Sequence, residues 1–110
     1  VRFPNLYREL AKKGADFISI PAAFTYTTGL AHWYSLIRAR AIENGCFVFA
    51  PAQVGNHENG RKTYGHSMIV DPWGKVISSA TNRKGIIYAK VDPTLVRKSR
   101  EKIPSMTSFL

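Results

Sequence analysis

Short apolar runs separated by polar and glycine-rich segments make up the first part of the chain. Residues 5–13 carry their apolar side chains on one side, and Gly14 follows them. This spacing predicts a helix that ends before the glycine. Residues 16–20 (DFISI) form a largely apolar run bounded by Pro21, which is typical of a short buried strand.

The strongest helical pattern covers residues 30–44 and closes at the Asn44-Gly45 pair. A second apolar run, 46–50 (CFVFA), follows it and predicts another buried strand. A strand, a helix and a strand in this order indicate a parallel βαβ unit. The intervening segment 21–29 is rich in threonine and contains glycine, so we expect a loop there rather than a helix.

The apolar residues of the 30–44 helix do not keep to one stripe, because they spread around most of its circumference. They are Trp33, Tyr34, Leu36, Ile37, Ala41 and Ile42. A helix of this kind is buried on two sides. A chain of 110 residues seldom supplies two buried layers to one helix, so we infer a subunit interface or a missing layer.

The second half of the chain alternates turns with three further strands and a final helix. These elements are expected over 67–70, 75–79, 86–91 and 93–102. Pro72-Trp73-Gly74 separates the first two strands and predicts a β-hairpin. Asp92-Pro93 is typical of a helix start, whereas residues 54–64 are polar and turn-rich. A parallel unit followed by a hairpin predicts an α/β fold with strands in one or two sheets.

The composition is that of one compact domain, since 110 residues with 45% hydrophobic side chains can bury a core. No apolar run approaches the ~20 residues of a membrane helix, so we expect no membrane contact. The single cysteine excludes an internal disulfide, and a reduced cytoplasm is the expected setting. The sequence starts at Val1 without a methionine, so we expect a processed chain or one that begins inside a longer gene product.

The net charge of +9 is uneven, and the densest basic stretch covers residues 83–102. A field of this kind can attract nucleic acid, anionic lipid or acidic substrates. It is more often a solvated face, or a face that meets an acidic segment outside the chain. The sequence has no arginine–glycine repeat, zinc-finger spacing or basic heptads, so we expect no specific nucleic acid partner.

Cys46 is the one thiol in the sequence, and it lies inside an apolar strand. A nucleophilic cysteine needs exposure and a neighbouring base or cation, so a core cysteine is the favoured interpretation. His32, His57 and His66 have no metal-ligand spacing, and no second cysteine supports a zinc site. We expect no metal or other cofactor and structural roles for the histidines, with His57 exposed in a loop and His66 bonded to loop backbone.

Two features of residues 21–44 are candidates for a site. The loop over 21–29 follows the carboxyl end of a predicted strand, where ligands bind in open α/β sheets. On the helix, Arg40 and Glu43 are three residues apart and can pair. This pair either belongs to an architectural ion-pair network or braces catalytic groups on a neighbouring strand.

Four motifs follow one another along the chain, namely PAAF with TG-x-AHW, RARAIEN, AQ-x-G and YGHSM-x-VDPWG. This series strongly resembles the nitrilase superfamily of carbon–nitrogen hydrolases, and within it the branch of deaminated glutathione amidase and omega-amidase. The resemblance implies part of an α-β-β-α sandwich that dimerises through helices. The 30–44 helix would then lie between its own sheet and a partner subunit, which makes a homo-oligomer the expected assembly.

Members of this family cleave amides or nitriles through a cysteine thiolate, a glutamate base and a lysine, without metal. The resemblance implies hydrolysis of a small carboxylate-bearing amide through a cysteine thioester. The family's cysteine sits a few residues before the RFP segment, so its position falls before Val1, and the glutamate and lysine lie further upstream. We therefore expect residues 1–110 to be the C-terminal portion of such a domain, inactive without the catalytic half.

Within this portion, the resemblance implies that residues 21–28 form a wall of the acyl pocket, with Phe24 and Thr28 nearest the substrate. Four residues of the following helix would have supporting roles. They are His32 and Trp33, which would brace the loop, and Arg40 and Glu43, which would tie the interfacial helix.

The alternative function is that of a non-catalytic truncated paralogue, which would use the basic 83–102 face to bind an acidic partner or nucleic acid. That interpretation predicts binding that falls steeply with salt concentration. The truncation also carries a folding expectation. Because both sheets of the sandwich would lack strands, we expect the isolated chain to aggregate or to stay molten.

Overall fold

The computed structural model describes residues 1–56, 60 and 62–106 as a mixed α/β structure. The strands are β1 (Phe17–Ser19), β2 (Phe47–Ala50), β3 (Val54–Asn56), β4 (Lys62–Tyr64), β5 (Met68–Val70) and β6 (Val76–Ser79). The helical segments are α1 (Pro4–Lys12), α2 (Tyr26–Thr28), the π-helical turn η1 (Gly29–Trp33), α3 (Tyr34–Asn44) and α4 (Thr94–Lys102). The predicted α/β class is confirmed.

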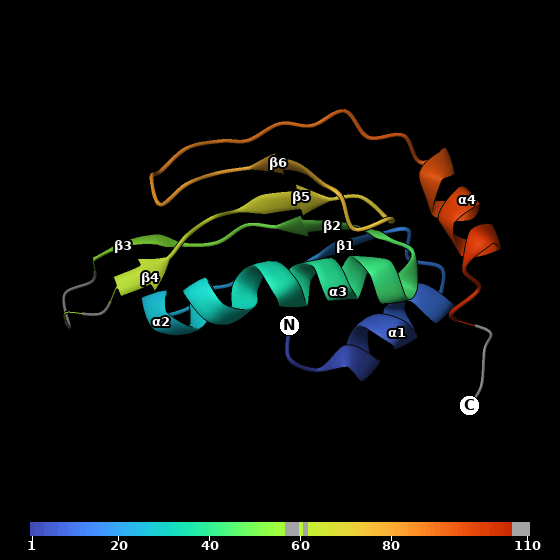
Figure 1. Cartoon of the computed structure of the whole chain (residues 1–110), viewed down its shortest axis with the longest axis horizontal. Coiled ribbons are helices and arrows are strands. Elements are labelled where there is room, and N and C mark those ends of the chain that lie inside the picture. Colours follow the sequence, from blue (N-terminus) through green and yellow to red (C-terminus); the bar gives the residue numbers. More distant parts are fainter. Residues whose placement is uncertain (57–59, 61, 107–110) are drawn as a thin grey trace.

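A four-stranded sheet in the order β1-β2-β5-β6 forms the centre of the molecule. β1 and β2 are parallel, with Ile18 opposite Val48, and α3 lies between them in the chain, which confirms the predicted parallel unit. β5 and β6 form the predicted hairpin, where the Asp71 carboxylate accepts the backbone N–H groups of Trp73 and Lys75. α1 and α3 lie together on one face of this sheet (Figure 1).

The core lies between this sheet and α3. Ile18, Val48 and Val70 are buried on the helix-covered face, while their neighbours along each strand point to the opposite face. Trp33 and Ile37 are fully buried against them. Each such side chain stabilises the fold by roughly 1.5–3 kcal/mol.

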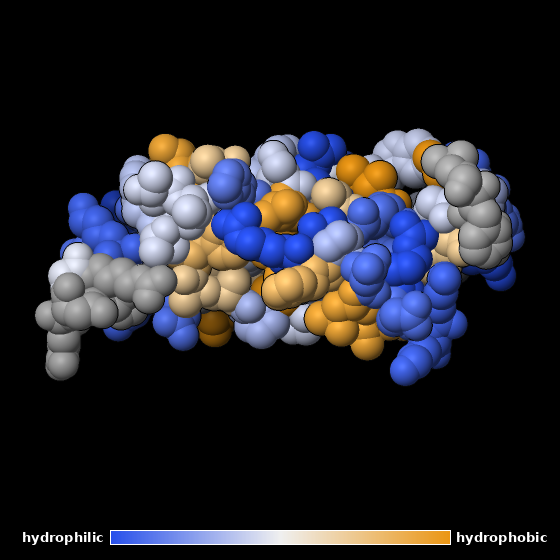
Figure 2. All heavy atoms as spheres, turned by 90° about the horizontal axis from the view of Figure 1, so that it is seen from below, coloured by the Kyte–Doolittle hydropathy of each residue, from blue (hydrophilic) through white to orange (hydrophobic). Residues whose placement is uncertain are grey.

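The outer side of α3 and of the turn before it is apolar but exposed. Leu30, Tyr34 and Ile42 lie four or eight residues apart and are 64, 55 and 44% exposed. Figure 2 views the helix-covered side and shows apolar surface between charged side chains. The sequence predicts burial of this helix on two sides. In the structure of the described residues its inner side is buried, whereas Leu30 and Tyr34 on the outer side are exposed and Ile42 packs beside Gly74.

The helix starts earlier than the sequence pattern predicts. The expected loop over 21–29 turns helical at Tyr26 and passes through the π-helical turn before α3 begins, so the prediction was wrong for 26–29. The cause is local hydrogen bonding. The backbone N–H of Gly29 donates to the carbonyl of Thr25, and the Thr28 hydroxyl bonds the same residue.

The polar stretch 54–64, expected only as turns, contains the two-stranded sheet of β3 and β4. Its apolar content is too low to predict strands. Its pairing instead depends on backbone bonds and on a bridge between Thr25 and Thr63, which joins this sheet to the 21–28 loop. In Figure 1 the β3–β4 sheet and α2 lie together at the end of the molecule opposite α4.

The strand predicted over 86–91 is absent from the structure of the described residues. The segment is extended and alternates in exposure, with Ile86 and Tyr88 at 77 and 80%. A strand requires a partner that accepts its backbone bonds, and none of the described strands pairs with it. Figure 1 shows this segment running along the sheet to α4 as a plain connection.

α4 begins at Thr94, one residue later than expected, and Pro93 rather than Asp92 is its N-cap residue. The Asp92 carboxylate accepts the backbone N–H of Thr94 at 3.0 Å and its hydroxyl at 2.7 Å. These bonds lower the pKa of Asp92 below its ordinary value. Of the helices in residues 1–56, 60 and 62–106, none is long and apolar enough to cross a bilayer.

Candidate functional site

The 21–28 loop lies at the carboxyl ends of β1 and β2, as the sequence predicts. Ala22 and Ala52 form a parallel bridge, so the two strands continue their pairing into the loops that follow them. The backbone N–H of Ala22 donates to Pro51, and that of Gln53 donates to Ala22, each at 3.0 Å. This edge is where an open α/β sheet binds ligands.

Phe24 follows this bridge in the 21–28 loop. Its half-buried ring lies 5.0 Å from the ring of Trp33, and the guanidinium of Arg2 lies over the Phe24 ring, 5.1 Å from its centroid. An arginine over an aromatic face is a favourable cation–π arrangement. Arg2 was not among the residues singled out from the sequence, because a single arginine near the chain start carries no pattern.

Thr28 is the last residue of α2 and is half-buried. Its hydroxyl lies 2.7 Å from the hydroxyl of Thr25 and donates to the Thr25 carbonyl at 3.3 Å. One hydroxyl pair therefore joins the two ends of the short helix. The expected substrate contacts of Phe24 and Thr28 remain predictions.

His32 and Trp33 have different surroundings. His32 is exposed, and its Nδ1 lies 3.2 Å from the Arg2 guanidinium. Trp33 is fully buried, packs on Phe24 and donates its indole N–H to the carbonyl of His66 at 2.8 Å. Trp33 is thus in contact with the loop, whereas His32 reaches it through Arg2.

Arg40 and Glu43 form the predicted ion pair, with Nη1 and Oε1 3.0 Å apart. Arg40 is buried, donates Nε–H to the carbonyl of Val1 at 2.8 Å and lies over the ring of Tyr7. The carbonyl of Glu43 accepts the hydroxyl of Ser105. This pair therefore joins α3 to the first residue of the chain and to the segment after α4.

Cys46 is a core cysteine, as predicted, and is fully buried. Burial raises the pKa of its thiol above the ordinary value, and the nearby Arg100 guanidinium opposes that rise only in part. Arg100 also bonds the Asp16 carboxylate at 3.2 Å and the Ala15 carbonyl at 2.8 Å. A buried thiol of raised pKa is a poor nucleophile.

The other two histidines were expected to be structural. His66 bonds loop backbone as predicted, with Nδ1 2.7 Å from the Tyr64 carbonyl. His57, expected in an exposed loop, lies outside the described residues. In residues 1–56, 60 and 62–106, no group of three or more metal-ligating side chains comes together.

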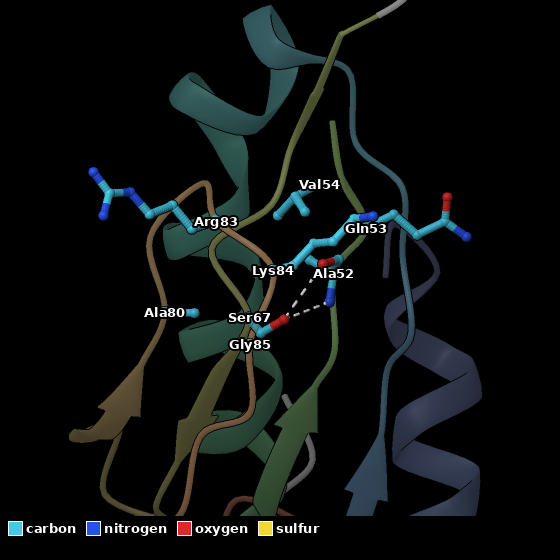
Figure 3. Close-up of a pocket in the computed structure, with 8 residues that line it drawn as sticks. All are labelled: Ala52, Gln53, Val54, Ser67, Ala80, Arg83, Lys84 and Gly85. Carbon is cyan, nitrogen blue, oxygen red and sulfur yellow. Dashed lines mark hydrogen bonds between the residues drawn. The ribbon is translucent and has the colours of Figure 1, made fainter. Parts of the chain in front are cut away.

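A cavity of about 370 Å³ opens beside the loop, at the ends of β2 and β6 (Figure 3). The Ser67 hydroxyl faces Ala52, whose backbone N–H donates to it at 2.8 Å. Lys84 extends across the opening toward Gln53, whereas Arg83 points away. The cavity thus presents one convergent cation at the same edge of the sheet as Phe24.

Comparison with known proteins identifies the family. The family model for carbon–nitrogen hydrolases matches residues 1–101. Deaminated glutathione amidase from Synechocystis is 49% identical over 106 residues, covering 96% of this chain and 39% of that protein. The rat protein of the same name is 46% identical over 104 residues, covering 94% and 32%.

Solved structures give the same result. The crystal structure of NitFhit from Caenorhabditis elegans superposes with a TM-score of 0.90 at 50% identity, covering 94% of this chain and 25% of that one. Nit3 from Saccharomyces cerevisiae, a nitrilase-superfamily member, gives 0.88 at 39% identity, covering 94% and 38%. The chain belongs to the carbon–nitrogen hydrolase family of the nitrilase superfamily. It spans well under half the length of these relatives.

Proposed function

We propose that this chain forms the substrate-pocket side of an amidase that hydrolyses the non-peptide C–N bond of a small, carboxylate-bearing amide. Residues upstream of Val1 in a complete polypeptide would supply the cysteine, glutamate and lysine. The glutamate would take the thiol proton, the thiolate would attack the amide carbon, and the C–N bond would break as the proton passes to the leaving amine. Water would then cleave the thioester and release the acid.

One observation carries this proposal beyond family membership. The carbonyl of Val1 accepts a bond from the buried Arg40, and the next residue, Arg2, lies over Phe24. Because a chain spans at most about 3.5 Å per residue, a cysteine three residues before Val1 would lie within roughly 10 Å of it. The proposed nucleophile would therefore approach the edge of the sheet that carries Phe24.

In this proposal each pocket residue contacts a different part of the substrate. Phe24 would pack on the acyl chain, and Thr28 would line the wall beside it. Arg2 would bind the substrate carboxylate, since a guanidinium matches a carboxylate with two parallel bonds. His32 and Trp33 would brace Arg2 and Phe24 from behind, in keeping with the contacts that they make.

The test is steady-state hydrolysis of a short ω-amide acid by the complete polypeptide, with Arg2→Met compared to Arg8→Met on α1. We expect Arg2→Met to lower kcat/KM for the acid about tenfold to a hundredfold, because the charge partner of the carboxylate is lost. The matching amide without a carboxylate should change less than about twofold. Equal losses for both substrates, or equal losses in the Arg8 variant, would contradict this assignment.

Residues 1–110 alone should have no amidase activity, because Cys46 is buried and the proposed reacting groups lie upstream. Turnover by the isolated chain that disappears in Cys46→Ser would refute the proposal. The proposed setting of the complete enzyme is a reducing cytoplasm, which would keep its nucleophile free of disulfides.

We also propose that the complete protein is a homo-oligomer through the 30–44 helix. The support is the exposure of three large apolar side chains on this segment, Leu30, Tyr34 and Ile42. A second copy would bury these side chains by two-fold symmetry. A monomer at micromolar concentration in sedimentation equilibrium would contradict this part of the proposal.

A further inference from the structure

The end of β4 and the residues just after it, 64–66, hold the candidate loop on the side away from the sheet edge. The backbone N–H of Tyr64 donates to the carbonyl of Phe24 at 2.9 Å. The carbonyl of His66 accepts the indole N–H of Trp33 at 2.8 Å, and Trp33 packs on the ring of Phe24. Both the backbone and the ring of Phe24 are therefore fixed by contacts that lead to this one segment.

His66 has an unusual backbone conformation that these contacts depend on. Its φ of 62° is the one positive value at a non-glycine residue in the described part of the chain. Such a conformation costs roughly 1–2 kcal/mol and persists only where the surroundings hold it. Here the ring stacks on Tyr64 with centroids 3.8 Å apart, and Nδ1–H donates to the Tyr64 carbonyl at 2.7 Å.

Tyr64 also fixes the other end of the loop. Gly29, the residue after Thr28, packs so closely on the Tyr64 side chain that a Cβ at this position has no room. The ring of Tyr26 meets that of Tyr64 edge-on at 5.8 Å. The short helix that ends at Thr28 is therefore held against the same tyrosine.

We propose that Tyr64 and His66 form a clamp that positions Phe24 and Thr28, and thereby sets the acyl-chain length that the amidase accepts. The inference rests on the proposed function, because it concerns the same pocket. Both clamp residues are positioning residues, since they act through Phe24, Thr28 and Trp33. A wall that moves by about 1 Å changes which chain length brings the amide carbon to the nucleophile.

The test uses two variants that each remove one contact of the clamp. Trp33→Phe keeps an aromatic ring beside Phe24 but removes the donor to the His66 carbonyl. His66→Gly keeps the positive φ but removes the stacked ring. Trp73→Phe is the matched control, because Trp73 lies on the β5–β6 turn and is 56% exposed.

The measurement is kcat/KM of the complete polypeptide for ω-amide acids of four, five and six carbons. We expect both clamp variants to lower kcat/KM for the preferred length about tenfold and to change the ratio between neighbouring lengths at least about threefold. The control should stay within about twofold for every length. A purely structural role would lower all lengths in proportion and leave the ratios unchanged.

Thermal melts of the same samples show whether each variant is folded. If Trp33→Phe is unfolded, the ratios are taken from His66→Gly alone. Folded variants with unchanged ratios would overturn the clamp and leave the proposed function standing. A parent polypeptide that hydrolyses no ω-amide would overturn the proposed function, and the clamp inference with it.

Discussion

The two faces of the central sheet differ in how completely they are covered. On the helix face, Ile18 and Val48 are 3 and 0% exposed beneath α3. On the opposite face, Phe17 is 45% exposed. A cavity of about 310 Å³ separates Phe49 and Ile69 from the extended segment that starts at residue 85. The chain thus covers one face fully and the other only in part.

This difference indicates that the sheet is suited to burial on both faces. Phe17 lies 5.5 Å from Phe47 and 6.0 Å from Phe49, so this face carries a row of aromatic rings, of which Phe47 is already buried and Phe17 is exposed. Strands that are apolar on both faces are typical of sheets covered on both sides. A second layer, such as that of the proposed sandwich, would bury this row.

The largest expected effect compares one residue from each face. Under conditions in which residues 1–110 unfold cooperatively, Ile37→Ala should lower their free energy of unfolding by about 3 kcal/mol, because it leaves a cavity in the closed core. Phe17→Ala should lower it by less than about 1 kcal/mol, because nearly half of that ring is exposed. In the complete polypeptide the two losses should become similar. Urea unfolding measures both, and equal losses in residues 1–110 would refute an open face.

A smaller effect is expected where α4 is attached to the sheet. Arg100→Ala should destabilise the chain by about 2 kcal/mol, because its guanidinium bonds the Ala15 and Asn44 carbonyls and the Cys46 thiol. Arg97→Ala is the control, since its side chain is 74% exposed and its pair with Glu101 is 3.9 Å long. The control should change stability by less than about 0.5 kcal/mol. Similar losses in both variants would argue against a specific attachment.

The smallest expected effect is a pH dependence of the free energy of unfolding, caused by the Cys46 thiol next to Arg100. Burial raises the pKa of the Cys46 thiol in the folded state. The stability that the neutral thiol contributes to the fold is therefore fully present below the pKa of the unfolded thiol. That contribution is lost as the pH rises toward the folded value, because the unfolded chain releases its proton first. Between pH 8 and 10 the parent should therefore lose more stability than Cys46→Ala. Parallel profiles in chemical unfolding would contradict this origin.

Elements that are marked by a local apolar run or a turn motif could be predicted from the sequence. The apolar runs place β1 and β2, and the turn at Pro72 and Gly74 places the hairpin. The strand predicted over 86–91 was wrong, because a strand also requires a neighbouring strand to pair with. The sequence of the segment itself does not indicate whether such a neighbour is present. The β3–β4 sheet was missed for the opposite reason, since its backbone pairing has no apolar signal.

The sequence predicted which segment forms the candidate site, but it predicted few of the contacts within that site. Phe24 and Trp33 were singled out, and they lie together. The contact of Arg2 with Phe24 and that of Trp33 with the His66 carbonyl could not be predicted, because they join residues 22 and 33 positions apart in the chain. An unusual φ at His66 is likewise a product of its tertiary surroundings.

The π-helical turn at Gly29–Trp33 determines which changes in chain length are tolerated between the loop and α3. A π-helical turn closes its hydrogen bonds over one residue more than an α-helical turn, so it holds an extra residue without the rotation of about 100° that one residue adds to an α-helix. Deleting one residue here should convert the turn to α-helix and leave Phe24 at the sheet edge, whereas inserting one should rotate the preceding segment relative to α3. Deletions in this turn should therefore be tolerated better than insertions.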